Sequence, residues 1–451
     1  MNAWQAARRS RDARFDGRFF IAVTSTGIYC RPVCPAPSPK EENVRYYPSA
    51  AAAAEAGFRP CLRCRPETSP VWNGTSGTVA RALRLIDGSA LDEAGVDELA
   101  ARLGIGSRHL RRLFLEHLGA TPVAVAQTRR IHFAKKLIDE TALPFTEVAL
   151  AAGFGSVRRF NATFQKLYKR TPSDLRRLAG KSAVNDPGDY RFRLRFRPPY
   201  DWERVLGFLR PRAIPGVEVV SESSYRRTIS MDGMRGSLEA YLDGDVIALR
   251  IQFPGSKQLF RIVERVKRLF DLNADPVEIA ATLGQDPLLS ARVAARPGLR
   301  VPGAWDGFEL AVRAVLGQQV TVKGATTLAG RVVAAYGVPV GDGYLFPERD
   351  VIAEADFAGL GLTSARAETL RQIARAGDFT LDEFLQLRGI GQWTAQYYAM
   401  RALHEPDAFP AGDLVLLKAA GLAKPRELEA RAETWRPWRA YAAMHLWHGE
   451  A

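Results

Sequence analysis

The chain has 451 residues and a formal net charge of +14, from 63 Lys and Arg residues against 49 Asp and Glu residues. This length allows about three domains with separate cores, and the positive charge favours nucleic acid over a membrane surface as the partner. We find no apolar run that could span a membrane and no apolar secretory segment near the N-terminus, so we expect a cytoplasmic protein.

All four cysteines of the chain lie in one short N-terminal segment. Cys30 and Cys34 form a close pair, and Cys61 and Cys64 form a second pair after twenty-six intervening residues. Two such pairs can each supply two ligands to a tetrahedral zinc ion, whereas a disulfide framework would be spread through the domains that it joins. The pattern predicts one zinc ion per chain, and a purely structural ion is the alternative to a reactive one.

Three segments surround these cysteines: Phe19–Cys30 (FFIAVTSTGIYC), Arg31–Pro35 and Phe58–Pro66. They resemble the N-terminal zinc domain of the Ada family of adaptive-response proteins, which repair methyl phosphotriesters in DNA. The resemblance implies that residues 1–75 form a small α+β zinc domain, in which Cys30 is both a metal ligand and a suicidal methyl acceptor. Zinc keeps thiols ionised, and methylation of Cys30 would remove one negative charge and so lessen the repulsion of DNA.

The next segment, residues 76–180, contains an internal repeat. Its matching parts are Asp97–Ala100 with Gly104–Ser107, and Thr146–Ala149 with Gly153–Ser156; each copy closes with Thr-Pro. In each copy a short helix is expected to end at a glycine, and Ser107 or Ser156 is placed to cap a second helix. A longer helix over Ala124–Glu140 separates the copies, so the pattern predicts two helix-turn-helix units.

This repeat resembles the AraC-type transcription regulators, most closely in Gly153-Phe154 and in Phe164–Pro172. The resemblance implies a DNA-binding regulator with RNA polymerase as a further partner. Polar side chains on the second helices are expected to meet base edges and phosphates, and a solvated charged face is the alternative. These side chains are Arg108, Arg111, Arg112, Arg158, Arg159 and Asn161. We expect His109, His117 and His132 to be ordinary surface or DNA-facing residues.

Residues 181–189 are small, polar and broken by proline and glycine, which is typical of a linker. Residues 190–256 are expected to form a small α+β domain in front of a helical one. Its predicted strands are Tyr190–Phe196, Gly216–Met231 and Leu238–Phe253, its helix is Trp202–Arg210, and Asp243-Gly244 is a turn. From Gln258 onward the pattern is almost entirely helical.

The most informative stretch of the C-terminal half begins with Leu387–Gly391 (LRGIG). Two glycines around one apolar residue allow a sharp turn that presents bare N–H groups at a helix N-terminus. Asp413 follows about twenty residues later and precedes the helical Leu414–Ala420. An ordinary loop and a plain N-cap are the alternatives for these two features. Together they resemble the helix-hairpin-helix DNA glycosylases of the AlkA type, the 3-methyladenine glycosylases II.

The resemblance assigns roles to single residues of the domain 257–451. Asp413 would stabilise the positive charge that develops on the sugar as the base leaves. Phe308–Val322 resembles the helix that leads into the DNA-penetrating loop, and the implied DNA contacts are Gly389, Gly391, Gln392, Thr394 and Gln319. Trp393, Tyr397 and Trp447 match an aromatic pocket, which favours a base made cationic by alkylation; core packing is the alternative.

Two absences bear on the chemistry that the resemblance implies. Glycosylases of this superfamily that also cut the strand place a lysine where this chain has Trp393, so a monofunctional enzyme is expected. The chain also lacks the cysteines that would hold an iron-sulfur cluster.

The patterns together predict a mainly α-helical multidomain protein of the alkylation response. It would combine methyl phosphotriester repair and sensing, transcription regulation and excision of 3-methyladenine-type bases, acting on alkylated duplex DNA and on promoter sites. The main alternative is a methylation-triggered regulator whose glycosylase half only binds DNA. A second alternative is a repair enzyme that regulates nothing.

Overall fold

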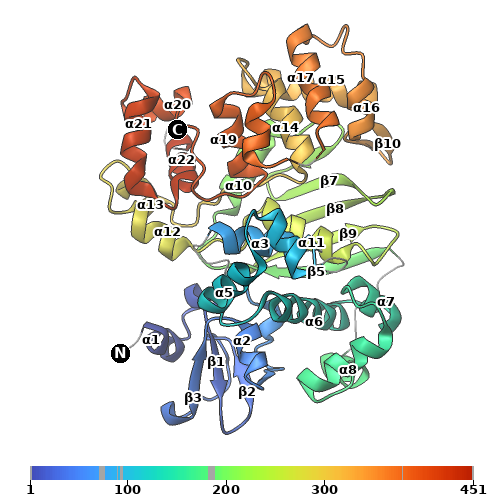
Figure 1. Ribbon diagram of the computed structural model, residues 1–451, viewed down its shortest axis with the longest axis vertical. Coiled ribbons are helices and arrows are strands. Elements are labelled where there is room, and N and C mark those ends of the chain that lie inside the picture. Colours follow the sequence, from blue (N-terminus) through green and yellow to red (C-terminus); the bar gives the residue numbers. More distant parts are fainter. Residues whose placement is uncertain are drawn as a thin grey trace. The chain divides into compact units, whose positions relative to one another are not determined.

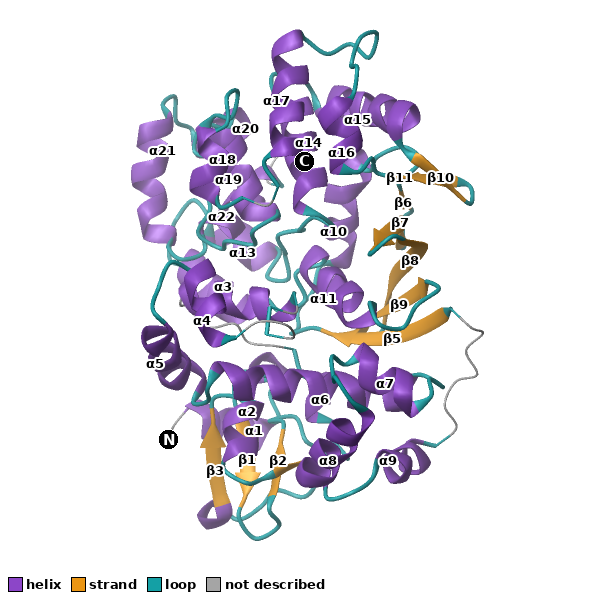
Figure 2. Cartoon of the chain, turned by 45° about the vertical axis from the view of Figure 1, so that its right-hand side comes forward, coloured by secondary structure: helices purple, strands orange, loops and turns teal. Residues whose placement is uncertain are grey.

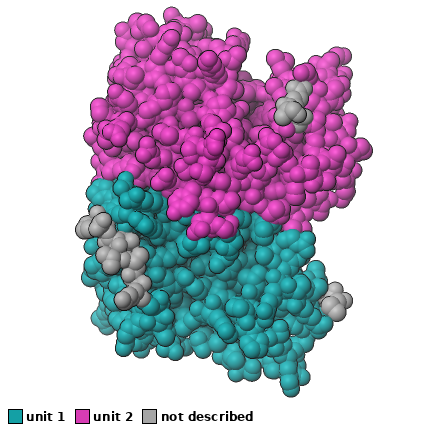
Figure 3. Space-filling view, turned by 180° about the vertical axis from the view of Figure 1, so that it is seen from behind, with its two compact units in different colours: residues 1–198, 245–264, 272–274 teal, residues 199–244, 265–271, 275–451 magenta. Residues whose placement is uncertain are grey.

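The computed structural model describes residues 3–70, 77–88, 90–91, 95–180, 188–377 and 379–448. Figures 1 and 2 show its helices and strands. The chain forms two compact units, coloured in Figure 3: unit 1 is residues 1–198, 245–264 and 272–274, and unit 2 is residues 199–244, 265–271 and 275–451. Within the described ranges, no helix is long and apolar enough to cross a membrane. Most of the predicted linker, residues 181–187, lies outside these ranges.

Unit 1 begins with a small four-stranded sheet in the order β3-β1-β2-β4. Its strands are β1 (Phe20–Val23), β2 (Ile28–Cys30), β3 (Val44–Tyr47) and β4 (Arg59–Pro60), with helices α1 (Ala3–Ser10) and α2 (Ala50–Glu55). Alternate residues of β1 face opposite sides, so Ile21 packs in one buried cluster with Phe19, and Phe20 packs in another with Tyr29. The sequence therefore forms two thin cores, one on each face of the sheet.

Seven helices of unit 1 carry the repeated segment. They are α3 (Gly77–Asp87), α4 (Val96–Arg102), α5 (Ser107–Leu118), α6 (Pro122–Glu140), α7 (Phe145–Ala151), α8 (Val157–Tyr168) and α9 (Pro172–Ala179). The long helix α6 confirms the predicted spacer, and Ser156 caps α8 by accepting a hydrogen bond from the Arg159 N–H at 3.2 Å. The prediction that Ser107 caps α5 was wrong. The extended backbone of Gly106 occupies the cap position, and Ser107 is already the first helical residue.

Two further strands belong to unit 1 and pack beside α6. β5 (Asp189–Arg195) pairs antiparallel with β9 (Val246–Gln252). Alternate residues of β5 are buried, and Phe192 lies 6.3 Å from Phe133 of α6, ring centroid to ring centroid. Phe260, at the start of α11 (Leu259–Leu269), lies 5.0 Å from the same ring. Phe133 therefore joins the helical segment to these strands.

Unit 2 contains an antiparallel meander of β6 (Glu218–Val220), β7 (Ser224–Met231) and β8 (Met234–Asp243), with α10 (Trp202–Leu209). The strand predicted over Gly216–Met231 is in fact divided in two, and the stretch Leu238–Phe253 divides at its predicted turn. The first breaks where the Ser221 hydroxyl accepts hydrogen bonds from the N–H groups of Ser223 and Ser224, which turns the chain. The second breaks at the predicted turn, where Gly244 has φ +60°.

The rest of unit 2 is helical around a central helix, α14 (Gly307–Leu316). This helix is apolar on nearly all sides and is therefore buried, with α15 (Val322–Tyr336), α17 (Ser364–Arg375) and α19 (Gln392–Arg401) packed around it. The other helices are α12 (Pro276–Leu283), α13 (Ser290–Ala295), α16 (Arg349–Glu354), α18 (Leu381–Gln386), α20 (Leu414–Ala420), α21 (Pro425–Ala432) and α22 (Arg439–Trp447). A short hairpin, β10 (Val338–Val340) with β11 (Gly343–Leu345), interrupts the predicted helical stretch.

Candidate functional site

The four cysteines meet at one point of unit 1. Their Sγ atoms all lie within 4.8 Å of one another, as four ligands about 2.3 Å from one zinc ion require. Pairing of β2 with β4 sets Tyr29 beside Pro60, which brings the next residues, Cys30 and Cys61, together. Cys34 returns to the site by a turn in which its N–H donates to the Arg31 carbonyl at 3.1 Å. The predicted zinc site is confirmed.

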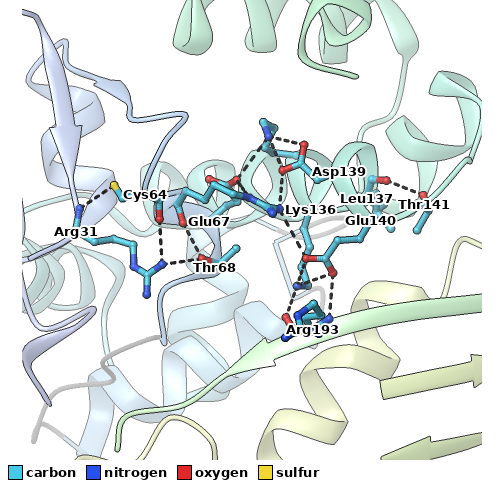
Figure 4. Close-up of polar contacts among 12 residues, drawn as sticks. Arg31, Cys64, Glu67, Thr68, Lys136, Leu137, Asp139, Glu140, Thr141 and Arg193 are labelled. Atoms are coloured by element: carbon cyan, nitrogen blue, oxygen red, sulfur yellow. Dashed lines mark hydrogen bonds and ion pairs between the residues drawn. The ribbon is translucent and has the colours of Figure 1, made fainter. Parts of the chain in front are cut away.

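Arg31 holds this site together, and sequence reasoning missed it. Its backbone N–H donates to Cys64 Sγ at 3.4 Å, and its guanidinium donates to the Cys64 carbonyl at 3.0 Å and to Thr68 Oγ1 at 2.9 Å. The guanidinium also forms an ion pair with Asp16, and the side chain is buried. Figure 4 shows Arg31 reaching across to Cys64. In the sequence, its position directly after Cys30 is the feature that could have indicated this role.

A cavity of about 400 Å³ opens beside Cys64 within unit 1. Its lining includes four arginines and two aspartates: Arg11, Arg31, Arg63, Arg195, Asp16 and Asp245. The excess of guanidinium groups over carboxylates suits a phosphate group next to the thiolates.

A chain of charges, most of them buried, runs from residues 65–67, here called the zinc loop, to α6 (Figure 4). Asp139 forms ion pairs with Arg65 at 2.6 Å and with Lys135 at 2.5 Å, and Lys135 also lies 3.6 Å from Glu67. Lys136, the next residue of α6, continues the chain of contacts by donating to the carbonyl oxygen of Arg193 in β5 at 2.7 Å. The segment after Cys64 is therefore tied to the helix between the two helix-turn-helix units.

Replacing Asp139 by Asn is expected to destabilise unit 1 by about 2 kcal/mol. The change removes a carboxylate from buried Lys135 and half-buried Arg65, which both keep the Glu67 carboxylate. The midpoint of thermal unfolding measures this effect. Asp97→Asn is the matched control, since Asp97 is an exposed carboxylate on α4. Equal midpoints for the two variants would show that the charges of α6 do not hold the zinc loop.

His132 corrects one expectation from the sequence. It was expected to be a surface or DNA-facing residue, but it is partly buried on α6, with Nε2 3.0 Å from the Tyr29 hydroxyl. Tyr29 is fully buried in the zinc domain and offers a polar partner at this contact. His132 therefore links α6 to the zinc domain.

The predicted DNA-reading side chains lie on the second helix of each helix-turn-helix unit. All six are exposed: Arg108, Arg111 and Arg112 on α5, and Arg158, Arg159 and Asn161 on α8. The apolar residues of the same helices, such as Phe114 and Phe160, are buried. The polar faces are therefore free to meet a groove of DNA.

In unit 2, the turn between α18 and α19 is built around Gly389. This residue has φ +89°, and a Cβ atom there would lie 2.5 Å from Thr369 Oγ1. Gly391 differs, because it has ordinary extended backbone and open space around it, and it caps α19 without a side-chain hydrogen bond. The N-terminus of α19 therefore presents backbone N–H groups, with Gln392 exposed beside them.

Gly389→Ala is expected to lower the stability of unit 2 by about 2 kcal/mol, because the new side chain meets Thr369 in a backbone conformation that disfavours it. Affinity for duplex DNA should fall as well. Thermal unfolding and fluorescence anisotropy measure the two effects. Gly391→Ala is the matched control in the same turn, and equal losses in both variants would contradict the assigned role of Gly389.

The loop between α14 and α15 is fastened to this turn through Gln318, which sequence reasoning also missed. Its side-chain amide donates to the Gly389 carbonyl at 2.9 Å and to Thr394 Oγ1 at 3.2 Å. Thr394 is therefore buried, and its backbone N–H is the group left for the predicted DNA contact. Gln319, predicted to contact DNA near the penetrating loop, is exposed with φ +56°, and Val320 beside it is 39% exposed.

Asp413 stands at the N-terminus of α20, where its carboxylate accepts four hydrogen bonds. Oδ1 accepts from the backbone N–H groups of Val415 at 3.0 Å and Leu416 at 3.1 Å, and from the Trp447 indole at 3.1 Å. Oδ2 accepts from the Trp393 indole at 2.9 Å. A helix cap was the alternative to a functional carboxylate. Asp413 does cap α20, and its carboxylate also accepts hydrogen bonds from two indoles.

The three predicted pocket residues lie together. Trp393 and Tyr397, one turn apart on α19, stack with ring centroids 5.2 Å apart and an interplanar angle of 7°. Trp447 of α22 lies 6.4 Å from Tyr397 and also 6.4 Å from Phe208 of α10. All three predicted rings are partly exposed, unlike the core aromatics. They form an aromatic wall beside Asp413.

Comparisons with known proteins agree with these sites. Three family models match separate parts of the chain: the metal binding domain of Ada at residues 2–67, a helix-turn-helix domain at residues 99–178 and the AlkA N-terminal domain at residues 191–306. A solved 3-methyladenine DNA-glycosylase from Archaeoglobus fulgidus covers 57% of this chain and 97% of its own, with a TM-score of 0.52 and 22% identity. That match establishes the fold of the C-terminal part.

Two curated relatives extend the match. DNA-3-methyladenine glycosylase 2 of Escherichia coli is 36% identical over 57% of this chain and 97% of its own length. A probable bifunctional transcriptional activator/DNA repair enzyme AlkA of Mycobacterium tuberculosis is 44% identical over 98% of this chain and 95% of its own length. Because that relative matches nearly end to end, this chain belongs to the family of bifunctional transcriptional activator/DNA repair enzymes of the AlkA type.

Proposed function

We propose that the chain is an alkylation-response protein that excises alkylated bases of the 3-methyladenine type, accepts methyl groups from DNA phosphotriesters and regulates transcription. The observation that carries this proposal is the Asp413 carboxylate, held by the Trp393 and Trp447 indoles beside Tyr397. The relatives named as a DNA-3-methyladenine glycosylase and as an activator/DNA repair enzyme support the substrate class and the combination.

In the excision half, the flipped base stacks on the aromatic wall and the sugar faces Asp413. The C1'–N bond breaks with its electron pair leaving on the base, and positive charge develops at C1' and O4'. The carboxylate stabilises this charge, water adds to C1', and its proton goes to solvent. Trp393 offers no amine for a covalent sugar adduct, so we propose hydrolysis without strand cleavage, which is the sense in which the glycosylase is monofunctional.

In the N-terminal half, Cys30 Sγ attacks the methyl carbon of the phosphotriester. An S–C bond forms, the C–O bond breaks, and the phosphate leaves as an ordinary diester anion. Bound zinc supplies the ionised state of the thiols. The methyl group stays on Cys30, so each chain reacts once, and the site loses one negative charge. We propose that this change favours promoter binding through α5 and α8. The promoter-bound protein would then contact RNA polymerase, in the cytoplasm.

Incubation of the full-length protein with methylated duplex DNA tests both reactions. We expect free 3-methyladenine in solution and one added methyl group per chain, which fragment spectra place on Cys30 and not on Cys34. Unmethylated DNA is the control. If the protein binds the methylated duplex but releases no base, the C-terminal half is a recognition module and the protein is a methylation-triggered regulator. If footprints on its own promoter do not respond to methylation, the regulatory part of the proposal fails.

A further inference from the structure

A buried guanidinium, that of Arg401, lies over the Tyr397 ring, 5.5 Å from its centroid. Arg401, at the end of α19, is 3% exposed and is fixed by three hydrogen bonds. Its Nε and Nη2 donate to the carbonyls of Pro302 at 2.8 Å and Gly303 at 2.7 Å, and its Nη1 donates to the Tyr397 hydroxyl at 2.8 Å. The guanidinium cannot turn away without losing the two backbone contacts, so it stays directed at the phenol.

Two more guanidinium groups on other elements act on the same phenol. Arg212, in η4 (Arg210–Arg212), interacts with the Tyr397 hydroxyl and lies 3.9 Å above the Phe208 ring centroid. Arg313 of α14 donates to the Arg212 carbonyl and acts on Tyr397 through its charge. Within the described ranges, no residue accepts a hydrogen bond from the Tyr397 hydroxyl, which itself accepts one from the cationic donor Arg401.

The remaining charged groups around this cluster offset only part of it. On the packed elements, Glu218 pairs with Arg313 at 3.2 Å, and Glu309 pairs with Arg227 at 2.6 Å. Among the described residues, Arg401 and Arg212 form no ion pair with a carboxylate. Burial lowers the pKa of His448, which packs against Phe208, to about 4, so this imidazole is neutral at pH 7. The Asp413 carboxylate is directed at the indoles.

These charges set the protonation state of the Tyr397 phenol. Burial raises the pKa of Tyr397, but the positive charges of Arg401, Arg212 and Arg313 outweigh burial and lower the pKa to about 8. The phenol would therefore lose its proton within the range in which the enzyme can be assayed. An ionised ring neutralises one guanidinium and places negative charge in the wall on which a cationic base stacks.

We propose that Tyr397 is the charge selector of the base pocket: its phenolate, held by Arg401 and Arg212, attracts a base made cationic by alkylation, whereas its neutral form leaves the arginines uncompensated. This inference rests on the proposed glycosylase function. It adds a specificity-determining ionisation to the stacking role expected for Tyr397, and it makes Arg401 and Arg212 positioning residues.

The test is a pH profile of the full-length protein with two readouts. The first is single-turnover release of 3-methyladenine, and the second is the ultraviolet absorbance of tyrosinate. With a midpoint near 8, the phenolate fraction and hence the release rate should rise about tenfold between about pH 7 and pH 9. Tyr397→Phe keeps the ring stack but should lose both the rise in rate and the early tyrosinate step near pH 8. Tyr241→Phe, which removes an exposed tyrosine outside the pocket, should keep both.

The outcomes separate this inference from the proposed function. If the wild type and Tyr397→Phe release base with the same pH profile, or if no early tyrosinate step is lost in Tyr397→Phe, Tyr397 is not the charge selector. If the tyrosinate step is present and Tyr397-dependent but the wild type releases no base at any pH, the glycosylase function fails while the ionisation stands. Arg212→Gln provides a second check, because it should move the midpoint of both readouts to higher pH.

Discussion

Replacing Asp413 by Asn is expected to lower the rate of base release by about a thousandfold. The amide keeps the shape of the carboxylate but carries no charge with which to stabilise the developing sugar cation. It also turns one hydrogen-bond acceptor into a donor. The least costly orientation keeps the carbonyl oxygen on the Val415, Leu416 and Trp447 N–H groups and sets the new NH₂ group against the Trp393 indole. Single-turnover release from methylated duplex DNA measures the loss.

The control must show that the variant is folded and still finds its substrate. Asp413→Asn should keep the cap of α20, so its thermal midpoint and DNA affinity should stay near those of the wild type. Asp350→Asn changes an exposed carboxylate on α16 and should leave release unchanged. Wild-type release by Asp413→Asn would assign the chemistry to another group.

Removal of zinc is expected to unfold the N-terminal sheet. Structural zinc contributes about 10–16 kcal/mol to the folding of small zinc domains, and the sheet has two thin apolar clusters that cannot replace it. Trypsin should then cut after Arg45 and Arg63, which lie in β3 and between the cysteines of the second pair. Protection should return when zinc is added back, and magnesium serves as the control ion. An unchanged digestion pattern after complete removal of zinc would show that the sheet stays folded without the ion.

The sequence was sufficient for features that lie close together along the chain. The spacing of Cys30, Cys34, Cys61 and Cys64 predicted the zinc site, and the helical period predicted α6. Local turn chemistry was less secure, because Gly106 took the cap position predicted for Ser107. The stretch Gly216–Met231 was predicted as one strand because β-propensity continues across the turn that the Ser221 hydroxyl makes.

Contacts between distant parts of the chain could not be predicted in the same way. Gln318 meets Gly389, and Arg401 meets the carbonyls of Pro302 and Gly303, far apart in sequence. Nothing in the local pattern distinguishes such an arginine from one on a solvated face. His132 shows the same limit, because its partner Tyr29 lies in another domain of the sequence. These roles depend on burial by segments that are distant in the sequence, and a single sequence does not show which segments come together.

The packing of the Phe133 ring affects how truncated forms of this protein should be designed. It packs against Phe192 and Phe260, which lie beyond the helix-turn-helix segment, and it is nearly fully buried. A recombinant fragment ending near residue 180 would expose this ring and the apolar side of α6 to water, and with it a surface that promotes aggregation. A fragment that continues to residue 264 would retain Phe192 and Phe260 as cover for this ring, so it is the safer choice for expression.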